Sequence, residues 1–280
     1  MDETTTVSTA RDRSPRGGTR PIAWVDGRVV PASEATVPLT DPGFLRGDAV
    51  FEAVLVRRGR THALEQHLAR MRRSAKALDL RLPVLRQVVA DLLAAWGDRD
   101  GAMRLVVTRG GTVRGLVEAP TWPDTLALAV VETPWRAPLS GVKTLSYAAN
   151  EQLIRRARSR EADDALIVDG GVVHELPTGS VCIVSDGAVS SPDPERLPIL
   201  DSVTVREVAE VIDVERTVPS LEEVLAADEL FVVSATRPVL PVHAVVVGDR
   251  EVSFPAPGPV TSRIRTAFHD HIEATLDPVP

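Results

Sequence analysis

Short strand-like runs alternate with amphipathic helical stretches along most of this 280-residue chain. Apolar residues recur at helical spacing over Leu64–Leu78 and Leu85–Trp96. Val50–Val56 and Met103–Thr108 are instead rich in β-branched residues and indicate strands. The alternation continues in the second half of the chain. Helices and strands are therefore mixed in both halves, and the pattern predicts an α+β fold.

Proline and glycine residues between positions 134 and 141 indicate an interruption in this pattern. We expect a small N-terminal domain at 21–133, a linker at 134–141 and a larger C-terminal domain at 142–280. A chain of this length with 44% hydrophobic residues can bury two cores. Residues 1–20 have no apolar centre, which predicts a disordered tail rather than a signal peptide.

Charge and composition argue against several classes of protein. A formal net charge of −7 without a basic stripe argues against nucleic-acid binding. No apolar run approaches the roughly 20 residues of a membrane span. The single cysteine, Cys182, excludes an internal disulfide and predicts a cytoplasmic protein. His67, His174 and His243 show no ligand spacing, so we expect no metal site.

Lysine is unusually scarce, because only Lys76 and Lys143 occur among 32 basic residues. Lys76 lies in a charged helical stretch, where a solvated ammonium is the ordinary interpretation. Lys143 follows an apolar run, in Gly141–Tyr147. A lysine can deprotonate and form an imine, whereas an arginine cannot. On spacing alone a surface lysine is the more common outcome for Lys143, so other motifs must decide.

Five short motifs, one of which contains Lys143, follow one another along the chain. They are Gly47–Glu52, His67–Arg70, Lys143–Tyr147, Glu175 with Thr178–Ser180, and Ala227–Phe231 running on to Pro241–Val242. In this order the chain resembles the fold-type IV pyridoxal-phosphate enzymes, which include branched-chain and D-amino-acid aminotransferases and aminodeoxychorismate lyase. The resemblance implies their two-domain fold, pyridoxal 5′-phosphate as cofactor, and a homodimer.

The resemblance also implies roles for individual residues. Lys143 matches the lysine that forms an imine with the cofactor, and Glu175 matches the carboxylate that keeps the ring nitrogen protonated. Tyr147 matches a residue that hydrogen-bonds the ring hydroxyl, and Arg70 matches the arginine that binds the phosphate. Without the resemblance, the plainer interpretations are a turn glutamate, a core or interface tyrosine and a solvated arginine.

Further phosphate contacts are implied at a helix start and at a loop. Val203 and Thr204 match the helix N-terminus, where backbone amides favour an anion. Ser234 and Ala235 match a second phosphate loop. Ser180 stands where the family usually has asparagine. Two other departures are Ser202, in place of a glycine, and Leu176–Pro177, which follows Glu175 where a glycine is usual.

Within the family, three strings are most similar to aminodeoxychorismate lyases. They are Lys143–Asn150, Arg104–Gly110 and the expected loop Pro238–Val242. Arg109 matches an arginine that binds a substrate carboxylate, and Arg104 matches one near the substrate pocket. The implied reaction eliminates pyruvate from aminodeoxychorismate to give 4-aminobenzoate for folate synthesis, with Lys143 as the base.

Two alternatives stay open on the sequence. The same motifs are compatible with an amino-acid transaminase acting on D-amino acids or branched-chain amino acids. A binding protein that has kept the scaffold without its cofactor is a third hypothesis. A small-molecule substrate is expected for both enzyme hypotheses.

Overall fold

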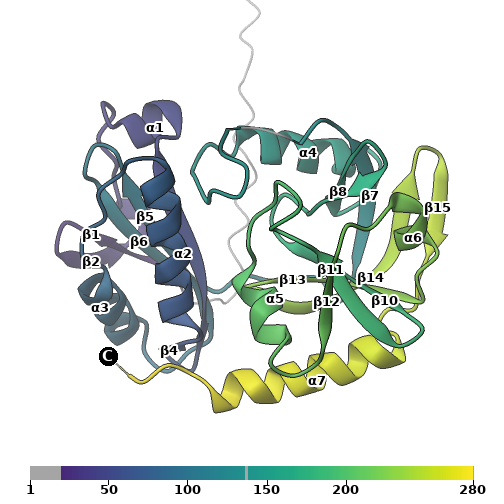
Figure 1. Cartoon of the computed structure of the whole chain (residues 1–280). Coiled ribbons are helices and arrows are strands. Elements are labelled where there is room, and N and C mark those ends of the chain that lie inside the picture. The colour runs from purple at the N-terminus through teal and green to yellow at the C-terminus, as the bar shows by residue number, and fades with distance from the viewer. Residues whose placement is uncertain (1–19, 136–137, 280) are drawn as a thin grey trace, which may run out of the picture.

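The computed structural model describes residues 20–135 and 138–279, which form two β-sheets with helices packed against them (Figure 1). The predicted α+β fold is confirmed. Apart from Arg20, the predicted tail lies outside the described residues, as do positions 136 and 137 of the predicted linker.

The first sheet has six strands, and every pairing in it is antiparallel. Its order is β2-β1-β6-β5-β3-β4, with bounds β1 (Ile22–Val25), β2 (Arg28–Pro31), β3 (Ala49–Arg57), β4 (Arg60–Thr61), β5 (Gly101–Thr108) and β6 (Val113–Glu118). Asp26 and Gly27 both have positive φ, at 49° and 89°, which closes the β1–β2 hairpin. The short helices η1 (Ala32–Glu34) and α1 (Pro42–Arg46) precede β3.

Two amphipathic helices cover this first sheet, α2 (Leu64–Ala77) and α3 (Arg86–Trp96). Both agree with the predicted helices to within one residue. Their apolar faces enter one core, in which Met71 of α2 and Leu92 of α3 are completely buried with Met103 and Leu105 of β5. The helical spacing of these side chains thus fixes how α2 lies on β3.

The second sheet contains nine strands in the order β12-β11-β10-β13-β14-β7-β8-β9, with β15 beside β14. Their bounds are β7 (Leu126–Glu132), β8 (Asp164–Asp169), β9 (Val172–Val173), β10 (Ser180–Ser185), β11 (Ala188–Pro192), β12 (Val214–Thr217), β13 (Glu229–Ser234), β14 (Arg237–Val247) and β15 (Arg250–Ser253).

β7 precedes the predicted linker but does not lie in the first sheet. β7 was expected in the N-terminal domain, but it pairs in parallel with β14 and β8 and so belongs to the second sheet. The chain passes between the sheets within residues 119–125. The proline- and glycine-containing stretch at 134–141 instead leads from β7 to the segment that carries Lys143.

The segment Pro238–Val242 was expected to be a loop, and this prediction is wrong. It lies within β14, the longest strand, between β13 and β7. Register shifts interrupt both neighbouring ladders, next to Val232 and next to Val242. Such irregularities suit a strand with two prolines, because each proline lacks one ladder donor.

Four helices pack on the second sheet: α4 (Ala148–Arg158), α5 (Val203–Val208), α6 (Leu221–Leu225) and α7 (Pro259–Ala274). α7 runs beneath the second sheet, and the chain after it continues to the first (Figure 1). Beyond its end, the carbonyl groups of Leu276 and Asp277 accept hydrogen bonds from Arg60 of β4. The last helix therefore fastens the second sheet to the first.

Candidate active site

Lys143 lies where the two sheets meet. Its segment returns from the second sheet to run beside β3, where the amide of Phe51 donates to the carbonyl of Lys143 at 3.1 Å. The amide of Lys143 donates to Oγ of Ser74 in α2, also at 3.1 Å. The main chain of Lys143 is thus held by β3 of the first sheet and by α2, the helix that packs on that sheet.

The amine of Lys143 has an unusual environment. Nζ lies 4.5 Å from the centre of the Phe51 ring. Among the described residues it makes no hydrogen bond or ion pair. Burial, reinforced by the nearby charge of Arg70, lowers the pKa of Lys143 to about 8. A substantial fraction of this amine is therefore neutral near physiological pH, as nucleophilic chemistry requires.

Glu175 follows β9 and faces the same region. Its carboxylate accepts hydrogen bonds from the indole of Trp135 at 3.0 Å and from the amide of Leu200 at 3.2 Å. Burial nevertheless raises the pKa of Glu175 to about 7, although both hydrogen bonds and the charge of Lys143 oppose this. The two donors fix the position of a carboxylate that lacks a full charge partner.

Tyr147 and Arg104 approach the same aromatic ring. Tyr147 packs edge-on against Phe51 at 5.3 Å between ring centres, and its hydroxyl donates to the carbonyl of Pro177 at 2.9 Å. Burial raises the pKa of Tyr147 to about 12, so the phenol stays neutral. The guanidinium carbon of Arg104 lies 5.1 Å from the Phe51 ring centre. Sequence reasoning named Phe51 only as part of a motif and missed its central position.

Arg70 is buried, and most of its guanidinium is committed to Glu52 of β3. Nε and Nη2 each donate to the Glu52 carboxylate at 2.8 Å, and His67 lies 2.9 Å from the same group. Burial alone would raise the pKa of Glu52, but Arg70 and His67 outweigh it and lower the pKa to about 2. The third nitrogen, Nη1, donates to the carbonyl of Asp201 at 3.1 Å, just before α5.

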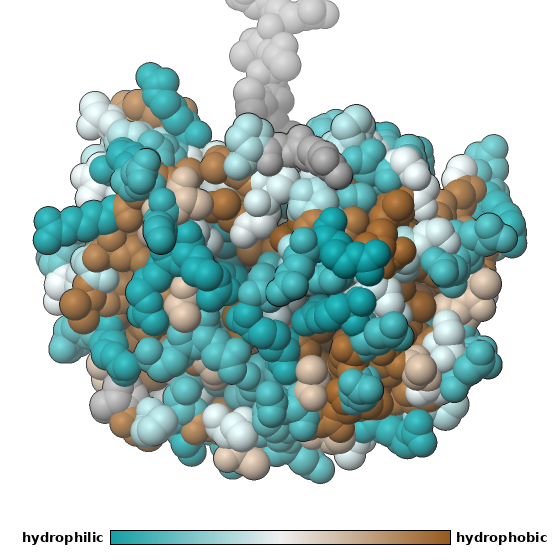
Figure 2. All heavy atoms as spheres, viewed as in Figure 1, coloured by the Kyte–Doolittle hydropathy of each residue, from teal (hydrophilic) through white to brown (hydrophobic). Residues whose placement is uncertain are grey.

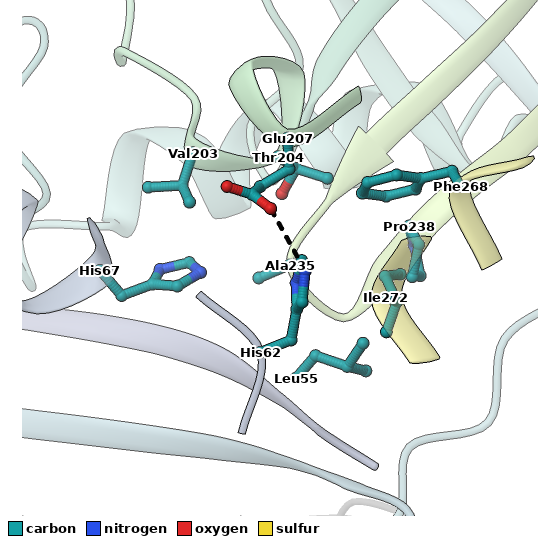
Figure 3. Close-up of a pocket in the computed structure, with 10 residues that line it drawn as sticks. All are labelled: Leu55, His62, His67, Val203, Thr204, Glu207, Ala235, Pro238, Phe268 and Ile272. Atoms are coloured by element: carbon teal, nitrogen blue, oxygen red, sulfur yellow. Dashed lines mark ion pairs between the residues drawn. The ribbon is translucent and has the colours of Figure 1, made fainter. Parts of the chain in front are cut away.

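The residues predicted to hold a phosphate come together from two elements. Val203 and Thr204 begin α5, and they line one small cavity with Ala235 and His67 (Figure 3). Ser202 stands in place of the family's usual glycine. Its hydroxyl accepts from the amide of Val205 at 3.3 Å and caps this helix.

The second predicted phosphate loop is the turn between β13 and β14. Ser234 ends β13, and its hydroxyl accepts from the amide of Arg237 at 3.2 Å. Ser180 begins β10, directly opposite Val233 in the sheet. The other departure, Leu176–Pro177, is accommodated as well, because Leu176 is buried and the carbonyl of Pro177 holds Tyr147.

Arg109 is engaged differently from its predicted role. Two of its nitrogens donate to the Asp48 carboxylate at 2.9 and 3.2 Å, and Nη1 donates to the carbonyl of Asp79 at 2.8 Å. Its guanidinium would have to release these acceptors to bind a substrate. The side chain of Arg104, in contrast, makes no hydrogen bond or ion pair within the described ranges.

Comparison with known proteins identifies the class to which this fold and site belong. Residues 49–245 match the family described as amino-transferase class IV, and the chain belongs to that family. It is 27% identical over 273 residues to a D-alanine aminotransferase of Bacillus licheniformis, covering 88% of this chain and 95% of that relative. It is 31% identical over 225 residues to a bifunctional aminodeoxychorismate lyase / D-amino acid transaminase of Mycobacterium tuberculosis, covering 68% and 77%.

Solved structures agree with this membership. A hypothetical aminotransferase from Mycobacterium tuberculosis in its PLP-bound form superposes with a TM-score of 0.79 at 25% identity, covering 91% of this chain and 99% of that one. A fold IV transaminase from Curtobacterium pusillum gives a TM-score of 0.78 at 28% identity, covering 89% and 99%.

The cofactor of this family member is pyridoxal 5′-phosphate. The chemistry of the donor set fits it. Lys143 offers a partly neutral amine, and Glu175 offers a fixed carboxylate without a full charge partner. Arg70 donates to the carbonyl of Asp201 just before α5, and Val203 and Thr204 line one cavity with Ala235 of the turn after β13.

Proposed function

We propose that this protein is an amino-acid transaminase, which moves the amino group of an α-amino acid to a 2-oxo acid. The observation that carries the proposal is the Lys143 amine, set against Phe51 with its pKa lowered to about 8, in a class IV aminotransferase fold. Most of the relatives described as D-alanine or branched-chain aminotransferases match this chain over 88% of its length or more, which supports transamination.

Lys143 is the catalytic residue in this proposal. Pyridoxal phosphate supplies a conjugated ring that withdraws electrons from the bound substrate. Lys143 holds the cofactor and, once displaced by the substrate amine, takes the proton from the carbon that bears nitrogen. The low pKa of its amine favours this, because a general base works best near the ambient pH.

Three other side chains support the reaction at fixed positions. Glu175, oriented by Trp135 and the Leu200 amide, holds a proton at the ring nitrogen. Tyr147 offers a neutral hydroxyl for the ring oxygen. Arg70 binds the phosphate with the amides of Val203, Thr204 and Ala235, and the hydroxyls of Ser180 and Ser234 complete this end.

Arg104 is the better placed of the two arginines for a substrate carboxylate. It is exposed, and it lies against the same ring as the Lys143 amine. Arg109 is already held by Asp48 and by main-chain carbonyls. We therefore assign the carboxylate contact to Arg104 and keep Arg109 as a testable second choice.

A second candidate function is the elimination of pyruvate from aminodeoxychorismate. The bifunctional relative, 31% identical over 68% of this chain, favours it. Elimination begins with the same proton transfer to Lys143, so one site can support both reactions. It differs because no oxo-acid acceptor is consumed.

One assay separates these functions. The purified protein is supplied with aminodeoxychorismate alone, and separately with D-alanine or a branched-chain amino acid plus 2-oxoglutarate. Steady amino transfer without 4-aminobenzoate supports the transaminase, whereas many turnovers to 4-aminobenzoate without an acceptor support the lyase. A protein that binds no cofactor, seen as no absorption near roughly 410–420 nm, would support the binding-protein hypothesis instead.

We also propose that the protein is a homodimer. Leu39, Phe44 and Leu45 are 73%, 61% and 55% exposed around α1, although most of the face seen in Figure 2 is hydrophilic. A second copy of the chain would cover this apolar group. No helix in the described ranges has the length and apolar character needed to cross a membrane. A cytoplasmic location stays a prediction.

A further inference from the structure

We propose that His62, Glu207 and His271 form a binding site for one divalent transition-metal ion, for which zinc is the best fit. The three residues come from the position just after β4, from α5 and from α7, and they are far apart in the sequence. Nε2 of His62 and Nε2 of His271 each lie 3.2 Å from Oε2 of Glu207. The ligand atoms of all three side chains lie within 4.8 Å of one another.

These separations agree with the geometry of a zinc site. Zinc binds imidazole nitrogen and carboxylate oxygen at about 2.0–2.1 Å, mostly with tetrahedral angles. Two ligand atoms on such an ion are therefore about 3.3 Å apart. Both nitrogen–oxygen distances in the cluster are within about 0.1 Å of that value. An ion can enter with a small rotation of the side chains.

A second observation concerns the His62 imidazole. His62 is only 6% exposed, and its Nε2 makes no hydrogen bond in spite of the short distance to Glu207. The two groups are thus in close contact without the alignment that a hydrogen bond requires. Figure 3 shows the His62 ring turned toward the Glu207 carboxylate. A buried nitrogen without a hydrogen bond is costly, and coordination to a metal would satisfy it.

The surroundings favour a fixed carboxylate and an open fourth position. Gln66 of α2 donates to Oε1 of Glu207, which leaves Oε2 toward the two histidines. Partners of this kind orient metal ligands. The adjoining cavity, lined also by Phe268 and Ile272, is the one that Val203, Thr204 and Ala235 border, so the fourth position lies on the side of the residues proposed for the phosphate.

The set of donor atoms selects the class of ion. Two imidazoles and one carboxylate suit zinc and its neighbours, whereas magnesium and calcium prefer oxygen ligands alone. A bound ion would connect β4 of the first sheet to α5 and α7 of the second. Its role in this proposal is to stabilise the contact between the sheets.

Zinc binding to the holoenzyme tests the proposal. The protein is treated with a chelator, dialysed, and titrated with zinc chloride and separately with magnesium chloride. Metal content per chain and the thermal midpoint are measured, and cofactor absorbance is followed to exclude binding to the cofactor. We expect one zinc per chain, a higher midpoint with zinc and no effect of magnesium.

Two variants and a matched control locate the site. His271→Gln and Glu207→Gln should weaken zinc binding by more than about 100-fold, because changing a supporting partner alone costs about 10- to 100-fold. His269→Gln changes an exposed histidine of the same helix and should bind zinc like the wild type. Wild-type protein that binds no zinc at micromolar concentrations, or a His271→Gln variant with unchanged affinity, would overturn the proposal.

Discussion

Two groups of ionisable side chains lie around the neighbouring residues Phe51 and Glu52 of β3, and the balance between burial and pairing differs between them. Around Phe51, burial outweighs pairing, so the pKa of Lys143 falls to about 8 and that of Glu175 rises to about 7. Around Glu52, pairing with Arg70 and His67 outweighs burial, and the pKa of Glu52 falls to about 2. The first group stays close to titration at neutral pH, whereas Glu52 is fixed as a charge.

The two groups therefore differ in how they change the free energy of unfolding as the pH changes. Glu52 stabilises the fold above pH 4.5, its ordinary value, and this contribution is lost as the pH falls toward 2. Glu175 has the opposite sign: its raised pKa lowers stability as the pH rises from 4.5, its ordinary value, to about 7, and the full cost persists above that. Lys143 lowers stability as the pH falls from 10.5 to about 8, because over this range the unfolded chain holds the proton and the folded chain does not. Lys143 and Glu175 therefore lower the free energy of unfolding, and the ion pair of Glu52 with Arg70 offsets part of this loss.

Lys143→Arg should give the largest effect. Arginine keeps the charge but does not deprotonate, so the variant neither holds the cofactor covalently nor transfers a proton. We expect turnover to fall by more than about 10³-fold. Borohydride reduction followed by peptide mapping should attach the cofactor to Lys143 in the wild type. Lys76→Arg is the matched control and should keep full activity; a cofactor label on Lys76 would contradict the assignment.

Glu52→Ala should test the paired cluster. The variant leaves the buried Arg70 without its carboxylate, which costs about 3–5 kcal/mol of unfolding free energy. Urea denaturation measures this loss. The wild type should also lose stability between pH 4.5 and 2, and this step should be missing in the variant.

Glu65→Ala, on the same helix as Arg70, is the control for this cluster. Glu65 pairs with Arg86 at 2.8 Å, but both side chains are more than half exposed. Its removal should cost no more than about 1 kcal/mol. Equal losses in the two variants would mean that the Glu52 pair is no stronger than a surface ion pair.

Local patterns in the sequence predict the local structure well and the pairing less well. The helices predicted from apolar spacing, α2 and α3, are confirmed because that spacing depends on neighbouring residues. The place of β7 and the strand character of Pro238–Val242 depend on distant partners, so the sequence did not reveal them.

The same limit applies to the site. Motifs predicted Lys143 and Glu175, which the structure brings into one region. Nothing in the spacing indicated that Glu52 would bind Arg70, or that Asp48 would bind Arg109. The cluster of His62, Glu207 and His271 has no sequence signature either, because its members are more than 60 positions apart in the chain.

Glu175→Gln tests the group of Lys143 and Glu175, whose pKa values lie near neutral pH. Glutamine can keep both hydrogen bonds, to Trp135 and Leu200, only in part, and it carries no charge. We expect the cofactor to stay bound and turnover to fall by about 10²-fold, since the ring nitrogen would lose the group that holds its proton. Single-turnover kinetics should locate the loss in proton abstraction. Glu151→Gln, an exposed change in α4, is the control. Full activity in the Glu175 variant would remove this residue from the mechanism.

The smallest effect should distinguish the two arginines, because among the described residues the Arg104 side chain makes no hydrogen bond or ion pair, whereas the Arg109 guanidinium is fully engaged. Arg104→Leu removes the cation next to Phe51, so kcat/KM for the amino-acid substrate should fall by roughly 10- to 150-fold, the loss of one charge-assisted contact. Arg109→Leu should leave kcat/KM nearly unchanged and instead lower the thermal midpoint, because its guanidinium holds Asp48 and the carbonyl of Asp79. Steady-state kinetics with both variants, on the same substrate, makes the comparison direct. The reverse result, a large loss of kcat/KM in Arg109→Leu alone, would show that Arg109 leaves Asp48 to bind the substrate, as the family resemblance implies.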